Sequence, residues 1–469
     1  MATTDRRRLL LLVLCTAAFM GSLDLFIVNV GLRAIGSDVG IDSLASLSWV
    51  LNAYAIVFAA LLVPAGRLAD RYGNRAGFMA GVALFTLSSI GCASSSDLWF
   101  IVAFRCLQAA GAAALTPTSL GLILTAIPAE HRAHSIRLWA VSGSLGAAAG
   151  PALGGLLVQV SWRTIFLLNV PIGIAALVGA ALLAPATRHG KDTRTPDLLG
   201  GLLLIAANGS VALGLVQGPG WGWASPGTLS AFAVSVATAV LFLLRSSGHP
   251  AAVIDLTLFR NASYARANVV MLLISIPFGA YLLGLVLWMQ EGWAWSPLET
   301  GLGIAPGPVM VTATALGLRR WVSRLPPGRV IAVGASFFAL GGILIGTSVT
   351  TSPNYLVGVV PGWLILGVGV GLTLPTVVQV ATSVLPPHQT STGSAVVQMS
   401  RQIGSVLGVA GLVVLLGTPA SATGLHDRLR TTFLIAAAVA LLTAAVAFPL
   451  RAARPTAVEP EPAADLALH

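Results

Sequence analysis

The sequence predicts an all-α membrane protein with about fourteen transmembrane helices. Its 469 residues are 56% hydrophobic and only 9% charged, with a mean hydropathy of +0.88, whereas globular proteins contain about a quarter charged residues. The apolar residues fall into about fourteen runs, most of them near the roughly 20 residues with which a helix crosses a bilayer. The second half of the chain also repeats the first, which is typical of transporters built from related halves.

The repeat is a constant offset of 258 residues. Two prolines and three glycines of the first half fall on identical residues of the second, and chance does not explain so many matches in one register. The matched pairs are Pro117 and Pro375, Pro128 and Pro386, Gly111 and Gly369, Gly146 and Gly404, and Gly150 and Gly408. Arg105 falls on Trp363, so the halves share a skeleton and differ in chemistry.

Fourteen apolar runs divide the chain into four parts. Residues 1–185 are predicted to form a first six-helix bundle, 186–262 a linker with two extra transmembrane helices, 263–451 a second six-helix bundle, and 452–469 a disordered tail rich in Pro, Ala and Glu. In order, the runs are Leu9–Leu32, Trp49–Leu68, Ala76–Ser94, Leu98–Ile127, Ser135–Val160, Ile165–Ala184, Leu198–Val216, Leu229–Leu244, Tyr264–Gln290, Leu298–Leu318, Val330–Val349, Tyr355–Leu385, Gly393–Gly417 and Thr432–Leu450.

The basic residues indicate the orientation in the membrane. Roughly 20 of the 26 lysines and arginines fall on one side of the predicted spans, and cytoplasmic loops carry such an excess. We therefore expect both termini in the cytoplasm, as an even number of spans requires. The first apolar run continues past Asp24 without a small-residue cleavage site, so we expect a retained span rather than a secretory signal. The excess of Arg over Lys indicates a GC-rich bacterial genome and hence a bacterial inner membrane.

Composition and motifs exclude several classes of function. The net charge of +10 comes from arginines in loops between apolar runs, which argues against nucleic-acid binding. The three cysteines lie inside apolar runs without CxxC spacing, so we expect no disulfide, metal or other cofactor. GxxxxGK, HExxH and GxSxG do not occur, which argues against ATP drive and against an enzyme. There is no polar cluster for a lipid-metabolising enzyme or flippase, and no soluble domain for a sensor.

Asp24 and Arg105 are charged residues deep in predicted spans. A charge at membrane depth costs about 2.5–3.5 kcal/mol on insertion scales, so it persists where it faces a partner or a wet cavity. Burial disfavours an unpaired carboxylate ion, so Asp24 could bind a proton and release it when a substrate or cation approaches. We predict Asp24 as the proton carrier and Arg105 as its electrostatic partner. The alternatives are a structural Asp24, a static ion pair, and an Arg105 that binds an anionic group of the substrate.

Several motifs resemble the major facilitator superfamily and, within it, the fourteen-helix drug:proton antiporter branch. The predicted cytoplasmic segment GRLADRYGNR resembles the most diagnostic motif of that superfamily, with Asn74 where a basic residue is usual. The resemblance implies that this segment gates the conformational change and that its acid latches one state. A copy in the second half, at residues 317–329, lacks the acid. The matching residues are Gly66, Asp70, Arg71, Gly73 and Arg75.

Three further motifs place the coupling and gating residues. SLDLFIVNVGL in the first span resembles the branch signature LDxTIVNVALP, with Arg33 in place of proline, and RCLQA resembles RxxQG of the fourth helix, whose arginine is linked to proton transfer in that family. The glycines of the fifth span look like the antiporter motif, which is typical of exporters, although close helix packing needs the same small residues. The predicted gating residues of this span are Gly146, Gly150, Pro151, Gly154 and Gly155.

The resemblance extends over nearly the whole chain. WRTIFLLNVPIG, VIDLTLFRN, SPLETG and SAVVQMSRQIGSVLGVA resemble inter-helix and thirteenth-helix signatures of the branch. We predict that polar and aromatic residues of several spans line a substrate cavity, while Glu299 is expected at the surface and Glu291 is equally compatible with either place. The predicted cavity residues are Asn29, Trp49, Tyr54, Gln108, Gln398, Arg401, Gln402 and Glu291.

The resemblance implies a major facilitator fold with two pseudo-symmetric six-helix bundles, two inserted helices and alternating access. The function predicted is proton-coupled export, by antiport, of small and largely apolar organic compounds such as antibiotics or drugs. The second half has no deep carboxylate, so neutral, monovalent or anionic substrates are expected rather than dications. Uptake by proton-coupled symport is the alternative. The expected partners are the substrate, protons and the lipid bilayer, and we expect a monomer.

Overall fold

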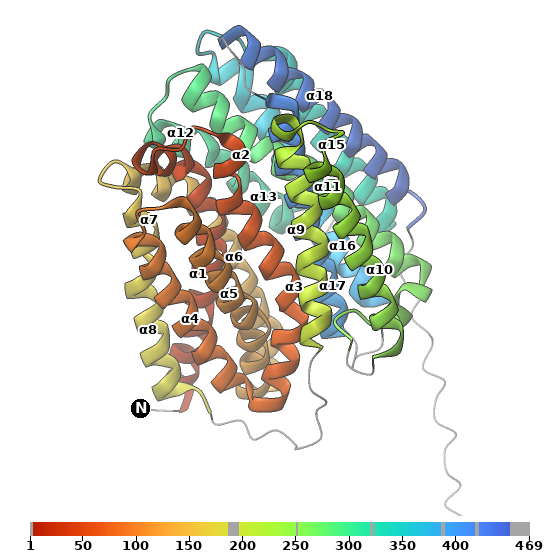
Figure 1. Cartoon of the computed structure of the whole chain (residues 1–469). Helices are drawn as coiled ribbons and strands as arrows, with labels where there is room; N and C mark the ends of the chain where they lie inside the picture. Colours follow the sequence, from red (N-terminus) through yellow and green to blue (C-terminus); the bar gives the residue numbers. More distant parts are fainter. Residues whose placement is uncertain are drawn as a thin grey trace, which may run out of the picture.

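The computed structural model describes residues 3–185, 197–249, 252–318, 322, 324–385, 390–417 and 422–450. All the regular structure in these residues is helical (Figure 1). The helices of the first part are α1 (Thr3–Val39), α2 (Leu44–Leu47), α3 (Trp49–Tyr72), α4 (Asn74–Ser94), α5 (Leu98–Ala126), α6 (Ala129–Val158), α7 (Arg163–Leu167), α8 (Asn169–Leu183), α9 (Leu198–Trp221) and α10 (Pro226–Gly248).

The later part of the chain contains the 3₁₀ helix η1 (Leu256–Arg260), two short π-helical segments and seven further α-helices in the described residues. These are α11 (Ala262–Leu287), η2 (Trp288–Gly292), α12 (Pro297–Ile304), α13 (Pro306–Gly317), α15 (Pro327–Ser348), η3 (Tyr355–Val359), α16 (Val360–Ser383), α17 (Thr390–Leu416) and α18 (Ala422–Ala447). The tail after residue 450 lies outside the described residues, as does the predicted disorder there.

Thirteen helical segments of the described chain are long and apolar enough to cross a membrane. An all-helical membrane protein is therefore confirmed, with one difference from the fourteen predicted single helices. The run Leu298–Leu318 is divided into α12 and α13, which meet at Ala305. Pro306 begins α13, and because proline has no backbone N–H and clashes with the preceding turn, it does not continue the helix before it.

Equivalent helices of the two halves pack through glycines. A Cβ added at Gly111 in α5 would lie 2.8 Å from the carbonyl oxygen of Gly81 in α4, and one at Gly369 in α16 would lie 2.5 Å from that of Gly334 in α15. Both distances are below any normal contact, so each helix pair requires glycine at the crossing. Gly111 and Gly369 are partners in the sequence repeat, and the repeat thus reflects a repeated helix packing.

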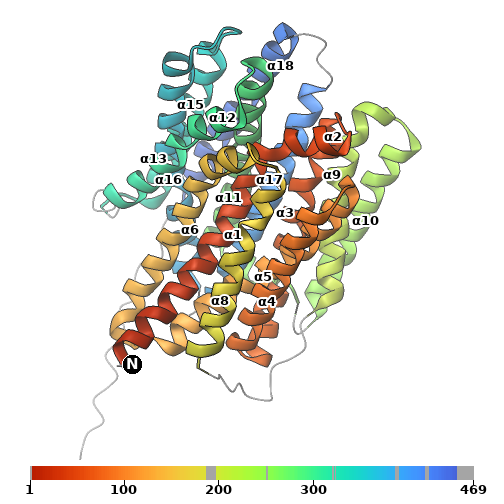
Figure 2. The ribbon, with the colours of Figure 1, turned by 90° about the vertical axis from the view of Figure 1, so that its left-hand side faces the viewer.

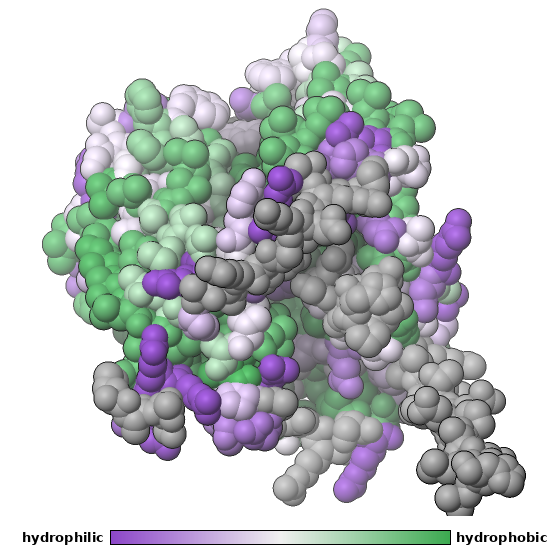
Figure 3. All heavy atoms as spheres, turned by 90° about the horizontal axis from the view of Figure 1, so that it is seen from below, coloured by the Kyte–Doolittle hydropathy of each residue, from purple (hydrophilic) through white to green (hydrophobic). Residues whose placement is uncertain are grey.

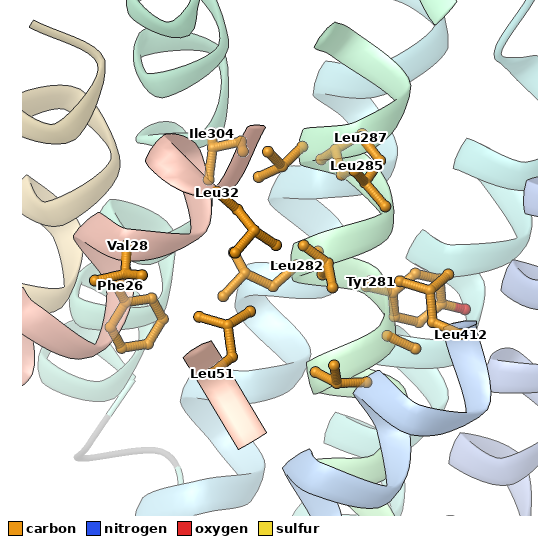
Figure 4. Close-up of a cluster of buried hydrophobic side chains, with 14 of the residues drawn as sticks. Phe26, Val28, Leu32, Leu51, Tyr281, Leu282, Leu285, Leu287, Ile304 and Leu412 are labelled. Atoms are coloured by element: carbon orange, nitrogen blue, oxygen red, sulfur yellow. The ribbon is translucent and has the colours of Figure 1, made fainter. Parts of the chain in front are cut away.

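A buried apolar cluster joins the two halves of the chain near the upper end of the view in Figure 1. It includes side chains of α1, α3 and α5 on one side, and of α11, α12, α16 and α17 on the other. Figure 4 shows Leu32 and Leu51 opposite Leu282 of α11, with Ile304 of α12 above them. This cluster brings the two halves into contact at the upper end, and we call this contact the upper closure.

Helices α9 and α10 lie at the side of the molecule, where α9 packs against α3 and α17 (Figure 2). Arg245 of α10 donates a 2.6 Å hydrogen bond to Asp197, which caps α9 through the backbone N–H of Gly200. The N-terminus lies at the lower end in Figure 1, together with the turn between α3 and α4. Figure 3 views the molecule from that end, with hydrophilic side chains scattered among apolar ones.

Candidate functional site

Asp24 and Arg105 form an ion pair in the interior of the first half. The Arg105 Nη1 lies 2.5 Å from the Asp24 Oδ2, and both side chains are fully buried. The amides of Gln108 and Asn169 each donate a 3.0 Å hydrogen bond to the Asp24 Oδ1. The carboxylate of α1 therefore accepts from α5 and α8, which fits an ionised Asp24, since a carboxylate in that form is acceptor only.

The guanidinium of Arg105 is held from several sides. Its Nε donates to the Val50 carbonyl oxygen at 3.1 Å, its Nη1 also donates to the Gln108 Oε1 at 2.6 Å, and its Cζ lies 4.1 Å from the centre of the Tyr54 ring. The Nη2 is buried and has no hydrogen-bond partner in the described part of the chain. The sequence suggested an isolated Asp24 as one possibility, and the structure shows instead a tightly paired one.

Ser89 and Asn169 complete the network, and the sequence reasoning did not single out either residue. The Ser89 hydroxyl accepts from Gln108 at 2.7 Å and from Asn169 at 3.4 Å. Asn169 lies in the motif WRTIFLLNVPIG, where an amide begins an otherwise apolar helix. That isolated polar residue was an available signal, whereas Ser89 is one of many serines in apolar runs. The network thus joins α1, α4, α5 and α8.

A central cavity of about 370 Å³ lies between the two halves. Its lining residues come from α1, α3, α5 and α6 of the first half and from α11, α13, α16 and α17 of the second. Such a volume is typical of sites for drug-sized ligands. Most of the wall is apolar, with Phe26, Phe58, Trp139, Phe278 and Trp363 among its aromatic members. No residue of α9 or α10 lines it.

A second cavity of about 60 Å³ shares wall residues with the central one and is also lined by Arg105 of the buried ion pair. Arg105 and Arg401 both line it, and Arg401 lines the central cavity as well. Asp24 lines neither space, but it contacts Arg105 in the wall of the smaller one, and Tyr54, stacked on Arg105, lines the larger. The ion pair therefore borders the smaller cavity through Arg105 and is separated from the central cavity by one side chain, that of Tyr54.

The predicted cavity residues divide into two groups. Tyr54, Gln398, Arg401 and Gln402 line the central cavity, and Asn29 lines the smaller one. The three others line neither of these spaces, which corrects their placement. They are Trp49, which packs against a buried apolar cluster with Ala55 and Ala212, Gln108, which the Asp24 network occupies, and Glu291, which forms an ion pair.

The ion pair of Glu291 lies at the upper closure between the two halves. Arg33, at the end of α1, donates through Nε to the Glu291 Oε1 at 2.6 Å, and the neighbouring Gln290 donates to the Val30 carbonyl oxygen at 3.0 Å. Arg33 replaces the proline of the resembling signature, and it has found a carboxylate partner in η2. About a third of each side chain is exposed, so the ion pair stabilises the upper closure only weakly.

We expect Arg33→Ala to open the upper closure only slightly, because an exposed ion pair contributes about 0.2–1 kcal/mol, which changes a population ratio by less than about fivefold. Spin labels on Ser96→Cys and Ser352→Cys, both exposed at this end, would report the opening as a longer distance. Only the introduced cysteines should react with the label. Cys15 and Cys92 are buried, but Cys106 is partly exposed, so the labelled variants also contain Cys106→Ala. The charge-swapped variant Arg33→Glu/Glu291→Arg should restore the wild-type distance between the labels. A longer distance in that variant would show that the ion pair does not stabilise the upper closure.

Five of the predicted gating residues lie in the segment from Gly66 to Arg75, which covers the end of α3, Gly73 and the start of α4. Gly73 has a φ of +98°, which only glycine adopts without strain. Arg75 donates to the Ala181 carbonyl oxygen at 2.7 Å, while Arg71 is exposed and lies over the Tyr72 ring. A Cβ added at Gly66 would make only an ordinary contact with Pro117. The side chain of Asp70 lies outside the described part of the structure, and the latch predicted for it stays a prediction.

The glycines of the fifth span pack against two different helices. A Cβ at Gly146, Gly150 or Gly154 would collide with α1, on both sides of Asp24 in the sequence. A Cβ at Gly155 would instead overlap the carbonyl oxygen of Pro297, and the carbonyl of Pro151 lies against Gly301 in the same way. One stripe of small residues on α6 thus serves both the helix with the carboxylate and the α12 contact between the halves.

Gly155→Ala is expected to disfavour the closed upper end. The added methyl group overlaps the Pro297 backbone, and such overpacking costs about 1–3 kcal/mol, so the same pair of spin labels should report a larger open population. Gly411→Ala is the matched control, because a Cβ at Gly411 meets nothing within 4 Å. An unchanged distance distribution in Gly155→Ala would show that the α6–α12 contact does not hold this end closed.

Comparison with known proteins gives the family. The profile of the Major Facilitator Superfamily matches residues 12–409. The methylenomycin A resistance protein of Bacillus subtilis is 31% identical over 94% of this chain and 92% of its own length, and the tetracenomycin C resistance and export protein of Streptomyces glaucescens is 33% identical over 87% and 76%. A crystal structure of a mutant of the peptide transporter POT in complex with sulfate shares the fold, with a TM-score of 0.70 and 17% identity over 94% of this chain and 96% of that one.

The multidrug resistance protein Stp of Mycobacterium tuberculosis (strain CDC 1551 / Oshkosh) is also similar, with 34% identity over 86% of this chain and 75% of its length. These names describe the relatives, and the antibiotics in them are not assigned to this chain. The profile match spans most of the chain, the relatives align over most of their length, and the fold agrees with both. The chain is a membrane transporter, not an enzyme, and it belongs to the Major Facilitator Superfamily.

Proposed function

We propose that this chain is a proton-coupled exporter of small, largely apolar organic compounds. It would work by alternating access between two six-helix bundles, residues 1–185 and 263–451, with α9 and α10 as inserted helices in the linker 186–262. If the broken helix α12–α13 crosses the membrane as one span, the total would be fourteen. Both termini would lie in the cytoplasm of a bacterial cell, and the lower end in Figure 1 would face it.

One observation carries this proposal: a buried carboxylate–guanidinium pair adjoins a drug-sized cavity that both halves of the chain line. The cavity gives a substrate contact with both moving parts, while Asp24 is the buried carboxylate that can exchange a proton beside it. With the lower end in the cytoplasm, the upper closure, formed by the apolar cluster and the Arg33–Glu291 pair, would make this conformation one that is closed toward the outside.

The coupling would follow from the charge state of the pair. In the conformation described, the ion pair with Arg105 and the two amide hydrogen bonds would favour an ionised Asp24. When the upper end opens, a proton from outside neutralises Asp24 and removes the charge that holds Arg105. The glycine contacts of α1 with α6 would transmit the change, because α1 contains Asp24 and also ends in the upper closure. Return to the closed form would re-form the pair and release the proton inside.

Export rather than uptake is favoured by the relatives, several of which are resistance or export proteins for antibiotics. This chain is 31–33% identical to the first two of these proteins over most of its length. The glycine motif of α6 fits this direction too, since the resemblance of the sequence links it to exporters.

Transport in proteoliposomes with an imposed pH gradient tests the proposal. Methylenomycin A and tetracenomycin C, named for two relatives, and a panel of unrelated antibiotics would be the trial compounds. Antiport predicts that a compound accumulates in vesicles with an acidic lumen, and that a protonophore abolishes the accumulation. Symport predicts accumulation when the acid is outside. Flux that ignores the gradient in both directions would refute proton coupling.

A further inference from the structure

The charge in the central cavity is unbalanced. Among the described residues that line the two cavities there is no aspartate, glutamate, lysine or histidine, and the charged ones are Arg105 and Arg401. Arg105 is neutralised by Asp24. Arg401 forms no ion pair with any described residue, so the space where a substrate would lie has one uncompensated positive charge.

Arg401 also has more hydrogen-bond donors than its surroundings satisfy. Its Nε is buried and has no partner in the described chain. Arg401 as a residue is only partly buried. A donor that is buried without a partner is costly, so an acceptor supplied by a ligand in the cavity would be favourable. The guanidinium has a planar fork of donors that fits a carboxylate in a bidentate geometry.

The neighbouring groups fit an acidic ligand with an apolar body. Gln398 and Gln402 are three residues before and one after Arg401 in α17, and all three side chains reach the central cavity, so amide donors flank the cation. Around this polar patch, the walls are aromatic and aliphatic. The cavity therefore offers one fixed anchor for negative charge and a large apolar space beside it.

We propose that the substrates are organic acids, bound as anions whose carboxylate or comparable acidic group pairs with Arg401 while the apolar remainder fills the central cavity. This inference rests on the proposed export function and narrows it to a substrate class. It makes Arg401 the residue that selects for charge, a role separate from that of the Asp24–Arg105 pair. A membrane potential that is negative inside would assist the exit of such an anion.

Binding to the purified protein in nanodiscs tests this inference independently of transport. The probes are dansyl-phenylalanine and dansyl-leucine, each compared with its own primary amide, which lacks the negative charge. Quenching of tryptophan fluorescence reports occupancy, because Trp139 and Trp363 line the cavity. Wild type should bind each acid at least about tenfold more tightly than its amide, as expected for hydrogen bonds to a charged group.

Arg401→Gln should reduce this acid-to-amide ratio to about one, and Arg401→Lys should keep part of the preference for the acid. Arg329→Gln is the matched control, since it removes one positive charge from an exposed position of α15 and should keep the wild-type ratio. A wild type that prefers the amides or binds no probe, or an Arg401→Gln that keeps the preference, would overturn the inference. Failure of gradient-driven transport with this preference intact would refute the exporter proposal alone.

Discussion

Asp24→Asn is expected to abolish the response of transport to a pH gradient, with a loss of at least roughly 100-fold in the gradient-driven rate, the scale on which removal of a proton-transfer group acts. The amide of asparagine does not take up or release a proton at physiological pH. It resembles the protonated carboxyl in size and charge, so exchange of substrate across the membrane without a gradient should persist. Initial rates in proteoliposomes, with and without the gradient, would separate the two activities.

Asp38→Asn is the matched control for this prediction. Asp38 lies on the same helix, but its side chain is partly exposed and pairs with Arg163 at 2.8 Å near the upper end. Its replacement should leave the gradient-driven rate close to that of wild type. Equal gradient-driven rates for Asp24→Asn and wild type would remove Asp24 from the coupling role and leave the ion pair a structural one.

The second large effect is expected on stability. Asp24→Asn leaves the Arg105 guanidinium fully buried without its counter-charge, and breaking such a pair costs about 3–5 kcal/mol. The double variant Asp24→Asn/Arg105→Gln removes both charges, so it should recover most of that loss while it still lacks coupling. Thermal unfolding of wild type, the two single variants and the double variant in detergent would measure this coupling energy.

Additive effects in that cycle would contradict the electrostatic account. If the double variant were less stable than either single variant, the two side chains would stabilise the protein through separate contacts, such as the stacking of Arg105 on Tyr54. A recovered stability together with absent coupling would also show that the transport defect of Asp24→Asn is not a folding defect.

The sequence was sufficient to predict the helices because the lipid bilayer is the solvent of the spans. In hydrocarbon each backbone N–H and C=O must be satisfied within its own segment, so a long apolar run becomes a helix, as thirteen helical segments show. The break in the remaining run also has a local cause in Pro306. The importance of Asp24 and Arg105 was likewise readable from composition, since two buried charges in separate spans each require a partner.

Only the tertiary structure decided which way each side chain points. A span that is apolar on every side, such as α5, gives no pattern from which its rotation can be read, so the place of Gln108 against Asp24 rather than in the cavity was not predictable. The same holds for Glu291, which meets Arg33 from the other half of the chain, and for Ser89. The sequence determined which segments cross the bilayer and where charge is buried, because solvation acts on each segment separately. Contacts between helices depend on their mutual rotation, and packing alone sets it.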